Sequence, residues 1–174
     1  IAMFITWALM TGCSSSRDLP LWFDQIQRLP IHSVSIQGHR LAYLDQGEGP
    51  PVVLLHGFGG SMWQWEYQQA ALSVRHRVIT PDLIGSGLSD KPDIDYRPDR
   101  LVGFFRDFLH ELHIERASLI GNSMGAGLAI AFSLTDPDRV DRMVLIDGLP
   151  EGSHFEIYTL DALRRSHDRG TDRH

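Results

Sequence analysis

One serine occupies a position suited to nucleophilic chemistry. Residues 121–125 read G-N-S-M-G, after the apolar run 117–120 and before the small apolar run 128–132. This pattern predicts a strand that turns sharply into a helix, with Ser123 at the corner. Such a corner holds the hydroxyl clear of the backbone and beside amides that can stabilise an oxyanion. Ser123 is therefore the candidate nucleophile.

Strands and helices alternate around this corner. Continuous apolar runs predict buried strands, and the segments between them predict helices. The expected strands are 52–55, 77–80, 117–120 and 143–146, and the expected helices are 62–74, 98–112 and one from the serine corner to about 134. Short links between them favour right-handed crossovers. The predicted fold is α/β, with a mostly parallel, doubly wound sheet and flanking helices.

An antiparallel element is expected before the alternating part. Residues 33–37 alternate polar and apolar side chains, and 40–45 follow after Gly38 and His39. Two such runs joined by a glycine-containing link predict a hairpin. The core domain is expected to cover residues 31–150.

Polar and glycine-rich loops follow the predicted strands. Residues 56–61 read H-G-F-G-G-S, residues 82–89 read D-L-I-G-S-G-L-S, and Asp147 and Gly148 follow the last strand. The carboxyl ends of parallel strands meet at one end of a sheet, where ligands bind. We therefore expect these loops to gather near the serine corner.

Three motifs in this order resemble the α/β-hydrolase fold family. They are His56-Gly57 at the end of a buried strand, the loop 82–89, and the serine corner 121–125. The G-N-S-M-G form of the corner, with Trp63 and Trp65, is similar to C-C bond hydrolases of ring-cleavage products and to small-ester hydrolases. The resemblance implies that Ser123 is the nucleophile and that the backbone N–H groups of Phe58 and Met124 form the oxyanion hole. It also implies that Gly57, Phe58 and Met124 line the substrate pocket.

The chain departs from the family pattern at its carboxyl end. In the family the acid usually follows the seventh strand and the histidine follows the eighth, whereas this chain stops after its sixth predicted strand. The resemblance therefore implies the first two-thirds of a hydrolase, without later strands or the catalytic histidine. Asp147 is a candidate acid, because some relatives place the acid after the sixth strand, or else a turn residue that begins the cap. His56 is implied to be structural.

The residues after 150 do not supply an obvious partner for Ser123. Residues 151–174 are expected to begin a cap region or to form a polar tail, with a helix starting between 153 and 163. His154, His167 and His174 follow no predicted strand that would aim them at the serine. The strand 143–146 is expected to keep a free edge, which favours aggregation or oligomerisation.

The first residues resemble a processing signal. Residues 1–17 form an apolar run that ends at Cys13 and a serine cluster, similar to a bacterial lipoprotein signal peptide. Cys13 is thus the candidate lipidation site, which predicts a lipid-anchored protein of the bacterial cell envelope. The alternatives are a buried first strand or a non-native remnant, and a cytoplasmic location. Residues 18–30 predict a short amphipathic helix that packs on the domain or lies on a membrane.

Composition narrows the function. The formal charge of −6, without any basic block interleaved with aromatic residues, argues against nucleic-acid binding. His110 and His113 lack the spacing of a zinc helix, and no nucleotide-binding pattern occurs, so neither a metal nor a cofactor is expected. The expected partner is a small molecule, and the pattern leaves the oligomeric state undecided.

The sequence predicts a serine hydrolase of a small carboxylic ester or a related acyl or C-C substrate. The alternative is an inactive remnant or a ligand-binding lipoprotein.

Overall fold

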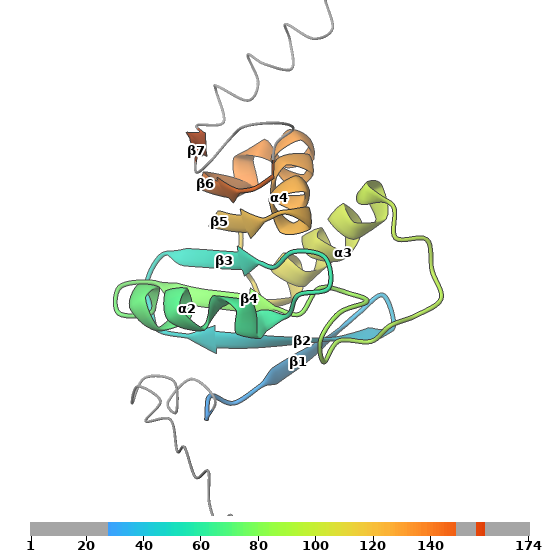
Figure 1. Cartoon of the computed structure of the whole chain (residues 1–174), viewed down its shortest axis with the longest axis horizontal. Coiled ribbons are helices and arrows are strands. Elements are labelled where there is room, and N and C mark those ends of the chain that lie inside the picture. The colour runs from blue at the N-terminus through green and yellow to red at the C-terminus, as the bar shows by residue number, and fades with distance from the viewer. Residues whose placement is uncertain (1–27, 149–155, 159–174) are drawn as a thin grey trace, which may run out of the picture.

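A seven-stranded sheet forms the centre of the molecule. The computed structural model describes residues 28–148 and 156–158. The strand order is β1-β2-β4-β3-β5-β6-β7 (Figure 1). The strands are β1 (His32–Ile36), β2 (His39–Gln46), β3 (Pro51–Leu55), β4 (Arg77–Pro81), β5 (Ala117–Asn122), β6 (Val140–Ile146) and β7 (Glu156–Tyr158).

The middle of the sheet is parallel and its margins are antiparallel. Strands β4, β3, β5 and β6 are parallel neighbours, whereas β2 pairs antiparallel with both β1 and β4. The β1–β2 hairpin turns at Gln37 and Gly38, whose φ angles are 51° and 82°. Positive φ at both turn residues matches the twist of a two-residue hairpin. The predicted hairpin and mostly parallel sheet are confirmed.

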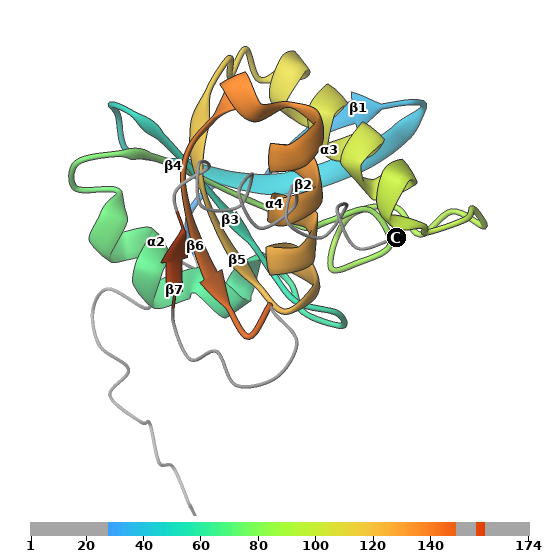
Figure 2. The same cartoon turned by 90° about the horizontal axis from the view of Figure 1, so that it is seen from above.

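Helices cover both faces of the sheet. Helix α2 (Glu66–Leu72) lies on one face, and α3 (Pro98–Glu111) and α4 (Met124–Thr135) lie side by side on the other (Figure 2). The expected helix over 62–74 is divided, because it begins as the 3-10 turn η1 (Met62–Trp65). A second 3-10 turn, η2 (Pro137–Arg139), follows α4.

Two apolar layers hold the helices to the sheet. Val53 and Leu55 of β3 join the core cluster under α3 and α4, whereas Val52 and Leu54 join the cluster with Trp65 on the α2 side. Successive side chains of a strand point to opposite faces, so one short apolar strand supplies both layers. This double burial explains why the central strands are continuous apolar runs rather than alternating ones.

The expectation of a free edge at 143–146 is wrong. Strand β7 pairs antiparallel with β6, opposite Met143, Val144 and Leu145. The helix expected to begin between 153 and 163 is also wrong where the structure describes this segment, because 156–158 are extended. A three-residue polar-apolar segment carries no clear strand signal by itself. It becomes a strand here because β6 offers unpaired backbone groups.

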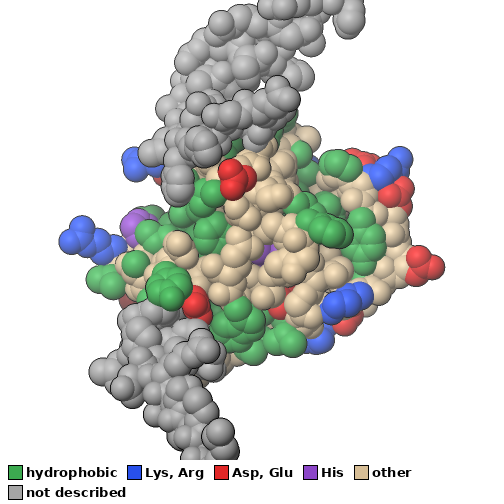
Figure 3. Space-filling view, in the orientation of Figure 1, with side chains coloured by type: hydrophobic (Ala, Val, Ile, Leu, Met, Phe, Trp, Pro, Cys, Tyr) green, Lys and Arg blue, Asp and Glu red, His purple; other side chains and the backbone are tan. Residues whose placement is uncertain are grey.

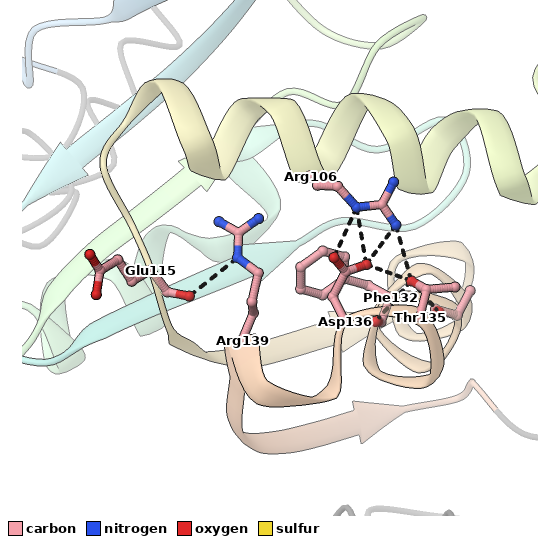
Figure 4. Close-up of polar contacts among 7 residues, drawn as sticks. Arg106, Glu115, Phe132, Thr135, Asp136 and Arg139 are labelled. Carbon is pink, nitrogen blue, oxygen red and sulfur yellow. Dashed lines mark hydrogen bonds and ion pairs between the residues drawn. The ribbon is translucent and has the colours of Figure 1, made fainter.

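Two arginines connect the helices and the sheet near the amino ends of β5 and β6. Arg106 of α3 binds Asp136 in a two-pronged contact, with Nε–Oδ1 at 2.9 Å and Nη2–Oδ2 at 2.6 Å (Figure 4). Arg139 donates to the carbonyl oxygens of Glu115 and Ile114 at 3.2 and 2.8 Å. These contacts lower the pKa of Asp136, chiefly through its hydrogen bonds with Arg106.

Several sequence predictions concern residues outside the described ranges. They are the signal-like segment with Cys13, nearly all of the amphipathic helix 18–30, and His154, His167 and His174. Within the described residues, no helix is long and apolar enough to cross a membrane.

Candidate active site

Ser123 lies at a strained corner between β5 and α4. Its φ and ψ angles are 50° and −114°, a conformation that residues with a β-carbon rarely adopt. The backbone fixes the corner on both sides, since the Ser123 N–H donates to Ile146 O at 2.8 Å and the Ser123 carbonyl accepts from Gly127 N–H at 3.0 Å. The side chain is exposed. The fold thus presents this hydroxyl at the carboxyl end of the central strands.

The two glycines of the motif make the corner possible. A β-carbon at Gly125 would overlap the carbonyl oxygen of Leu55, and one at Gly121 would overlap the carbonyl oxygen of Gly125. Neither glycine has a positive φ angle, so the requirement is space rather than backbone freedom. The first turn of α4 can therefore lie directly against the end of β3.

The loop after β3 lies against the serine. A β-carbon at Gly57 would be 3.3 Å from Ser123 Cβ and 3.0 Å from Asn122 Oδ1. Among the described residues, the backbone N–H groups of Phe58 and Met124 form no hydrogen bond. Met124 is also the first residue of α4, where the helix dipole favours negative charge. The structure therefore brings together Ser123 and the two amide donors expected from the sequence.

Gln64 joins the two sides of this arrangement, and the sequence did not reveal it. Its Oε1 accepts from Gly57 N–H at 3.3 Å, and its Nε2 donates to Asn122 Oδ1 at 2.9 Å. One amide side chain thus connects the loop after β3 to the residue before the nucleophile. A glutamine in a predicted helix gives no sequence signal for such a bridge. Only its position one turn after a glycine-rich loop could have drawn attention to it.

His56 supports the loop and is not available as a base for Ser123. The side chain is fully buried, and Nε2 accepts from Leu83 N–H at 3.0 Å. The proton therefore lies on Nδ1, which donates to Gly57 O at 2.8 Å. Burial lowers the pKa of His56, although the Gly57 hydrogen bond and the nearby Asp82 charge oppose the shift.

Asp82 connects the loops on the neighbouring strand ends. This buried carboxylate accepts from Met62 N–H through Oδ1 and from Leu88 N–H through Oδ2, both at 2.6 Å. Its carbonyl oxygen accepts the Ser89 hydroxyl at 2.5 Å. Two loops that are separate in the sequence are thereby held in one arrangement beside His56.

Asp147 adjoins the serine corner through the neighbouring strand β6. It follows Ile146, whose carbonyl oxygen accepts the Ser123 N–H, and it has a φ angle of 50°. Gly148 packs so closely that a β-carbon there would overlap the Ala126 side chain. The Asp147 side chain is exposed. The geometry is compatible with a turn residue and with an acid beside the nucleophile, so its catalytic role stays a prediction.

The Ser123 hydroxyl has no base beside it in the described part of the chain. No hydrogen bond to Ser123 Oγ forms among residues 28–148 and 156–158. Within the same residues, no group of three or more His, Cys, Asp and Glu side chains could hold a metal ion.

An open cleft with mostly apolar walls begins beside these groups. It has a volume of about 320 Å³ and is lined by Phe58, Ile84, Gly85, Ser86, Tyr96, Leu101 and Met124. The Phe58 side chain is 89% exposed, although it is large and apolar. On the face shown in Figure 3, hydrophobic side chains form separate patches and charged ones lie mostly toward the margin. Phe58 and Met124 thus line the same cleft, whereas Gly57 is not among its lining residues.

The family is shown by comparison with known proteins. The model of the alpha/beta hydrolase fold family matches residues 50–173, well over half of the chain. The chain belongs to the α/β-hydrolase fold family. The fold class expected from the sequence is therefore confirmed, both by this match and by the observed sheet.

Individual α/β hydrolases resemble the chain over its core. It is 39% identical over 113 residues to 2-hydroxymuconate semialdehyde hydrolase of Pseudomonas sp. (strain CF600). That alignment covers 63% of this chain and 40% of the relative. It is 33% identical over 119 residues to soluble epoxide hydrolase of Corynebacterium sp. (strain C12), with 68% and 42% covered. The crystal structure of a membrane phospholipase A, described as a bacterial virulence factor, matches with a TM-score of 0.70 and 30% identity. That match covers 75% of this chain and 44% of the other.

These relatives place the chain in a family of hydrolases. The chain spans about two fifths of the length of the curated relatives. The shared part includes the serine corner and the loops beside it, since the family match begins at residue 50.

Proposed function

We propose that this α/β hydrolase cleaves a small carboxylic ester or a related acyl substrate, with Ser123 as the nucleophile. One observation carries the proposal: an exposed serine at a strained corner lies beside a loop and a helix start whose backbone N–H groups, those of Phe58 and Met124, form no hydrogen bond among the described residues. Strain at a non-glycine residue persists only where the surroundings impose it, and such sites are often functional. Free amides beside a hydroxyl fit an oxyanion better than they fit a structural role.

The proposed reaction has two balanced halves. Ser123 Oγ adds to the carbonyl carbon while a base takes its proton, and the carbonyl oxygen becomes an oxyanion bound by Phe58 N–H and Met124 N–H. The oxyanion collapses, the C–O bond to the alcohol breaks, and the alcohol leaves with that proton. Water then adds to the acyl-enzyme, releases the carboxylic acid and restores the serine.

The base and its supporting acid complete the proposal. The proposed base is a histidine outside the described residues, because both His56 nitrogens are occupied and no other described histidine forms a hydrogen bond with Ser123. Asp147 is the proposed acid, since its backbone directly adjoins the corner. A C-C bond next to a carbonyl is the second bond class, favoured by the relative named 2-hydroxymuconate semialdehyde hydrolase.

Membrane attachment through a lipid on Cys13 is a separate proposal that rests on the sequence alone. A cysteine after a short apolar run, followed by three serines, is the supporting observation. Detergent phase partition of the protein made in bacteria tests it. The unaltered chain is expected in the detergent phase and Cys13→Ala in the aqueous phase, and equal partition of both would contradict the proposal.

A fluorophosphonate probe tests the nucleophile directly. It reacts with serines that a base has activated, so the 174-residue chain is incubated with the probe and the labelled peptide is identified. The unaltered chain is labelled at Ser123 only if one of its histidines outside the described residues acts as the base, and Ser123→Ala is not labelled. No labelling of the unaltered chain would contradict its activity and favour the alternative, a non-catalytic protein that binds ligands in the same cleft.

A further inference from the structure

A second apolar groove continues from the cleft beside Ser123. It has a volume of about 240 Å³ and is lined by Pro98, Leu101, Met124, Gly127 and Leu128. These residues come from the first turn of α3 and the first two turns of α4. We call this feature the apolar groove.

The apolar groove and the cleft share two walls. Leu101 and Met124 line both, so the two spaces adjoin at the point where α4 begins. Met124 directly follows Ser123, and its N–H is one of the two proposed oxyanion donors. A ligand whose carbonyl lies at Ser123 can therefore extend along α4 past Met124 toward Gly127.

The chemistry of the walls selects an uncharged chain. None of the residues that line the apolar groove has a side-chain nitrogen or oxygen atom. In the adjoining cleft the polar side chains are Ser86 and Tyr96, and the Tyr96 hydroxyl already donates to Pro92 O at 2.8 Å. The Tyr96 ring packs tightly over Gly85, which fixes that wall. A charged or strongly hydrogen-bonding ligand would lose water there without gaining a partner.

We propose that the apolar groove binds the hydrocarbon chain of the substrate, so that the preferred substrates are esters with an unbranched apolar chain. This inference rests on the proposed ester hydrolysis at Ser123. From Met124 to Leu128 the groove follows α4 for about 6 Å, one helical turn. Each methylene group buried there increases kcat/KM about fourfold, until the groove is filled.

Gly127 provides a way to fill the groove. A β-carbon at this helical position would meet nothing within 4 Å, so a side chain can be attached there without displacing the backbone. Gly127→Leu places a branched side chain in the groove. Gly103 in α3 is the matched control, because a β-carbon there meets only Gln37 Nε2 at 3.9 Å and the residue does not line the groove.

Two series of esters test the inference. In p-nitrophenyl alkanoates the acyl chain lengthens, and in alkyl acetates the alcohol chain lengthens, so the two series tell which part of the ester occupies the groove. We expect kcat/KM to rise with length in one series, and the ratio of octyl-length to two-carbon substrates to fall at least tenfold in Gly127→Leu. Gly103→Leu keeps the ratio of the unaltered chain. No rise with length, or a rise that survives Gly127→Leu, would overturn the inference.

Binding without chemistry separates this inference from the proposed function. Decanoate and decanol are titrated against Ser123→Ala and against the double variant with Gly127→Leu. We expect at least one of them to bind Ser123→Ala and to bind the double variant at least tenfold more weakly. Equal binding of both proteins, or none, would overturn the groove, whereas a failure of fluorophosphonate labelling alone would overturn only the catalytic role of Ser123.

Discussion

At the amino ends of β5 and β6 the polar groups satisfy one another, whereas at the carboxyl ends they do not. Arg106 and Asp136 form a two-pronged ion pair (Figure 4), and Arg139 donates to the carbonyl oxygens of Glu115 and Ile114. At the opposite end, Ser123 presents a hydroxyl and Phe58 and Met124 present amides that form no hydrogen bond among the described residues. The contacts at the amino ends hold α3 to the end of α4. The groups at the carboxyl ends stay available for the proposed ligand.

The carboxyl end is nevertheless the more tightly built of the two. Asp82, His56 and Gln64 use buried or bridging hydrogen bonds to hold the loops that carry the free amides. Positive φ angles at Ser123 and Asp147 occur at this end of the strands. Free groups at a site need rigid support, because a displacement of about 1 Å can cost about a hundredfold in rate. The contrast between the two ends can be tested in four ways.

The largest expected effect on stability comes from the glycine under the corner. Gly125→Ala places a β-carbon on the Leu55 carbonyl oxygen, so we expect the free energy of unfolding to fall by about 3 kcal/mol or more. Gly127→Ala, two residues along the same helix in open space, is expected to raise it by about 0.5–1 kcal/mol. Urea unfolding of both variants measures the difference, and similar stabilities would contradict the described packing.

Asp82→Asn weakens the support of the loops. An amide keeps one oxygen, so either Met62 N–H or Leu88 N–H, each 2.6 Å from a carboxylate oxygen, loses its acceptor. We expect a loss of about 2 kcal/mol in urea unfolding, the usual cost of a buried unsatisfied donor. Asp93→Asn is the surface control, since the Asp93 side chain is exposed. An Asp82→Asn protein as stable as this control would show that the carboxylate is not a structural anchor.

Gln64→Ala tests positioning at the site with little effect on the fold. The side chain is exposed, so the unfolding free energy should change by less than about 0.5 kcal/mol. Loss of the bridge between Gly57 and Asn122 loosens the proposed oxyanion loop. We expect kcat to fall about tenfold while KM changes little, because the loop acts on the transition state. Gln64→Glu keeps the acceptor for the Gly57 N–H but loses the donor to Asn122, so its kcat should lie between those of the unaltered chain and Gln64→Ala. A fall confined to KM would contradict a positioning role.

The smallest effect is expected at the amino end. Asp136→Asn removes the ion pair with Arg106, a partly exposed contact worth about 1 kcal/mol at most. The pKa of Asp136 is lowered in the fold, so the pair contributes fully above the unfolded pKa of about 3.9. Its contribution is lost as the pH falls through the lower folded pKa.

Unfolding of the two proteins at several pH values measures this effect. The difference between the unaltered chain and Asp136→Asn should be constant from about pH 7 to pH 5 and shrink below about pH 4. Ester hydrolysis, if present, should be the same in both. A difference that grows toward acid pH would contradict the described ion pair.

The sequence predicted the elements and the corner better than the contacts between side chains. The apolar runs and the glycines around Ser123 are local signals, because a buried parallel strand and a tight turn restrict residue types. The bridge through Gln64 could not be predicted, since it depends on how two separate loops approach each other. Strand β7 was missed because Glu156–Tyr158 becomes extended only through pairing with β6. The expected helix 62–74 likewise begins as a 3-10 turn where Asp82 accepts the Met62 N–H.

The central claim is that the carboxyl end of the sheet is arranged around Ser123 as a nucleophile. The most direct measurement is mass spectrometry of the chain quenched in acid during incubation with a p-nitrophenyl ester, followed by peptide mapping. We expect an acyl group on the peptide that contains Ser123, and none on that peptide in Ser123→Ala. An acyl group on another residue during hydrolysis, or hydrolysis that persists at the same rate in Ser123→Ala, would contradict it.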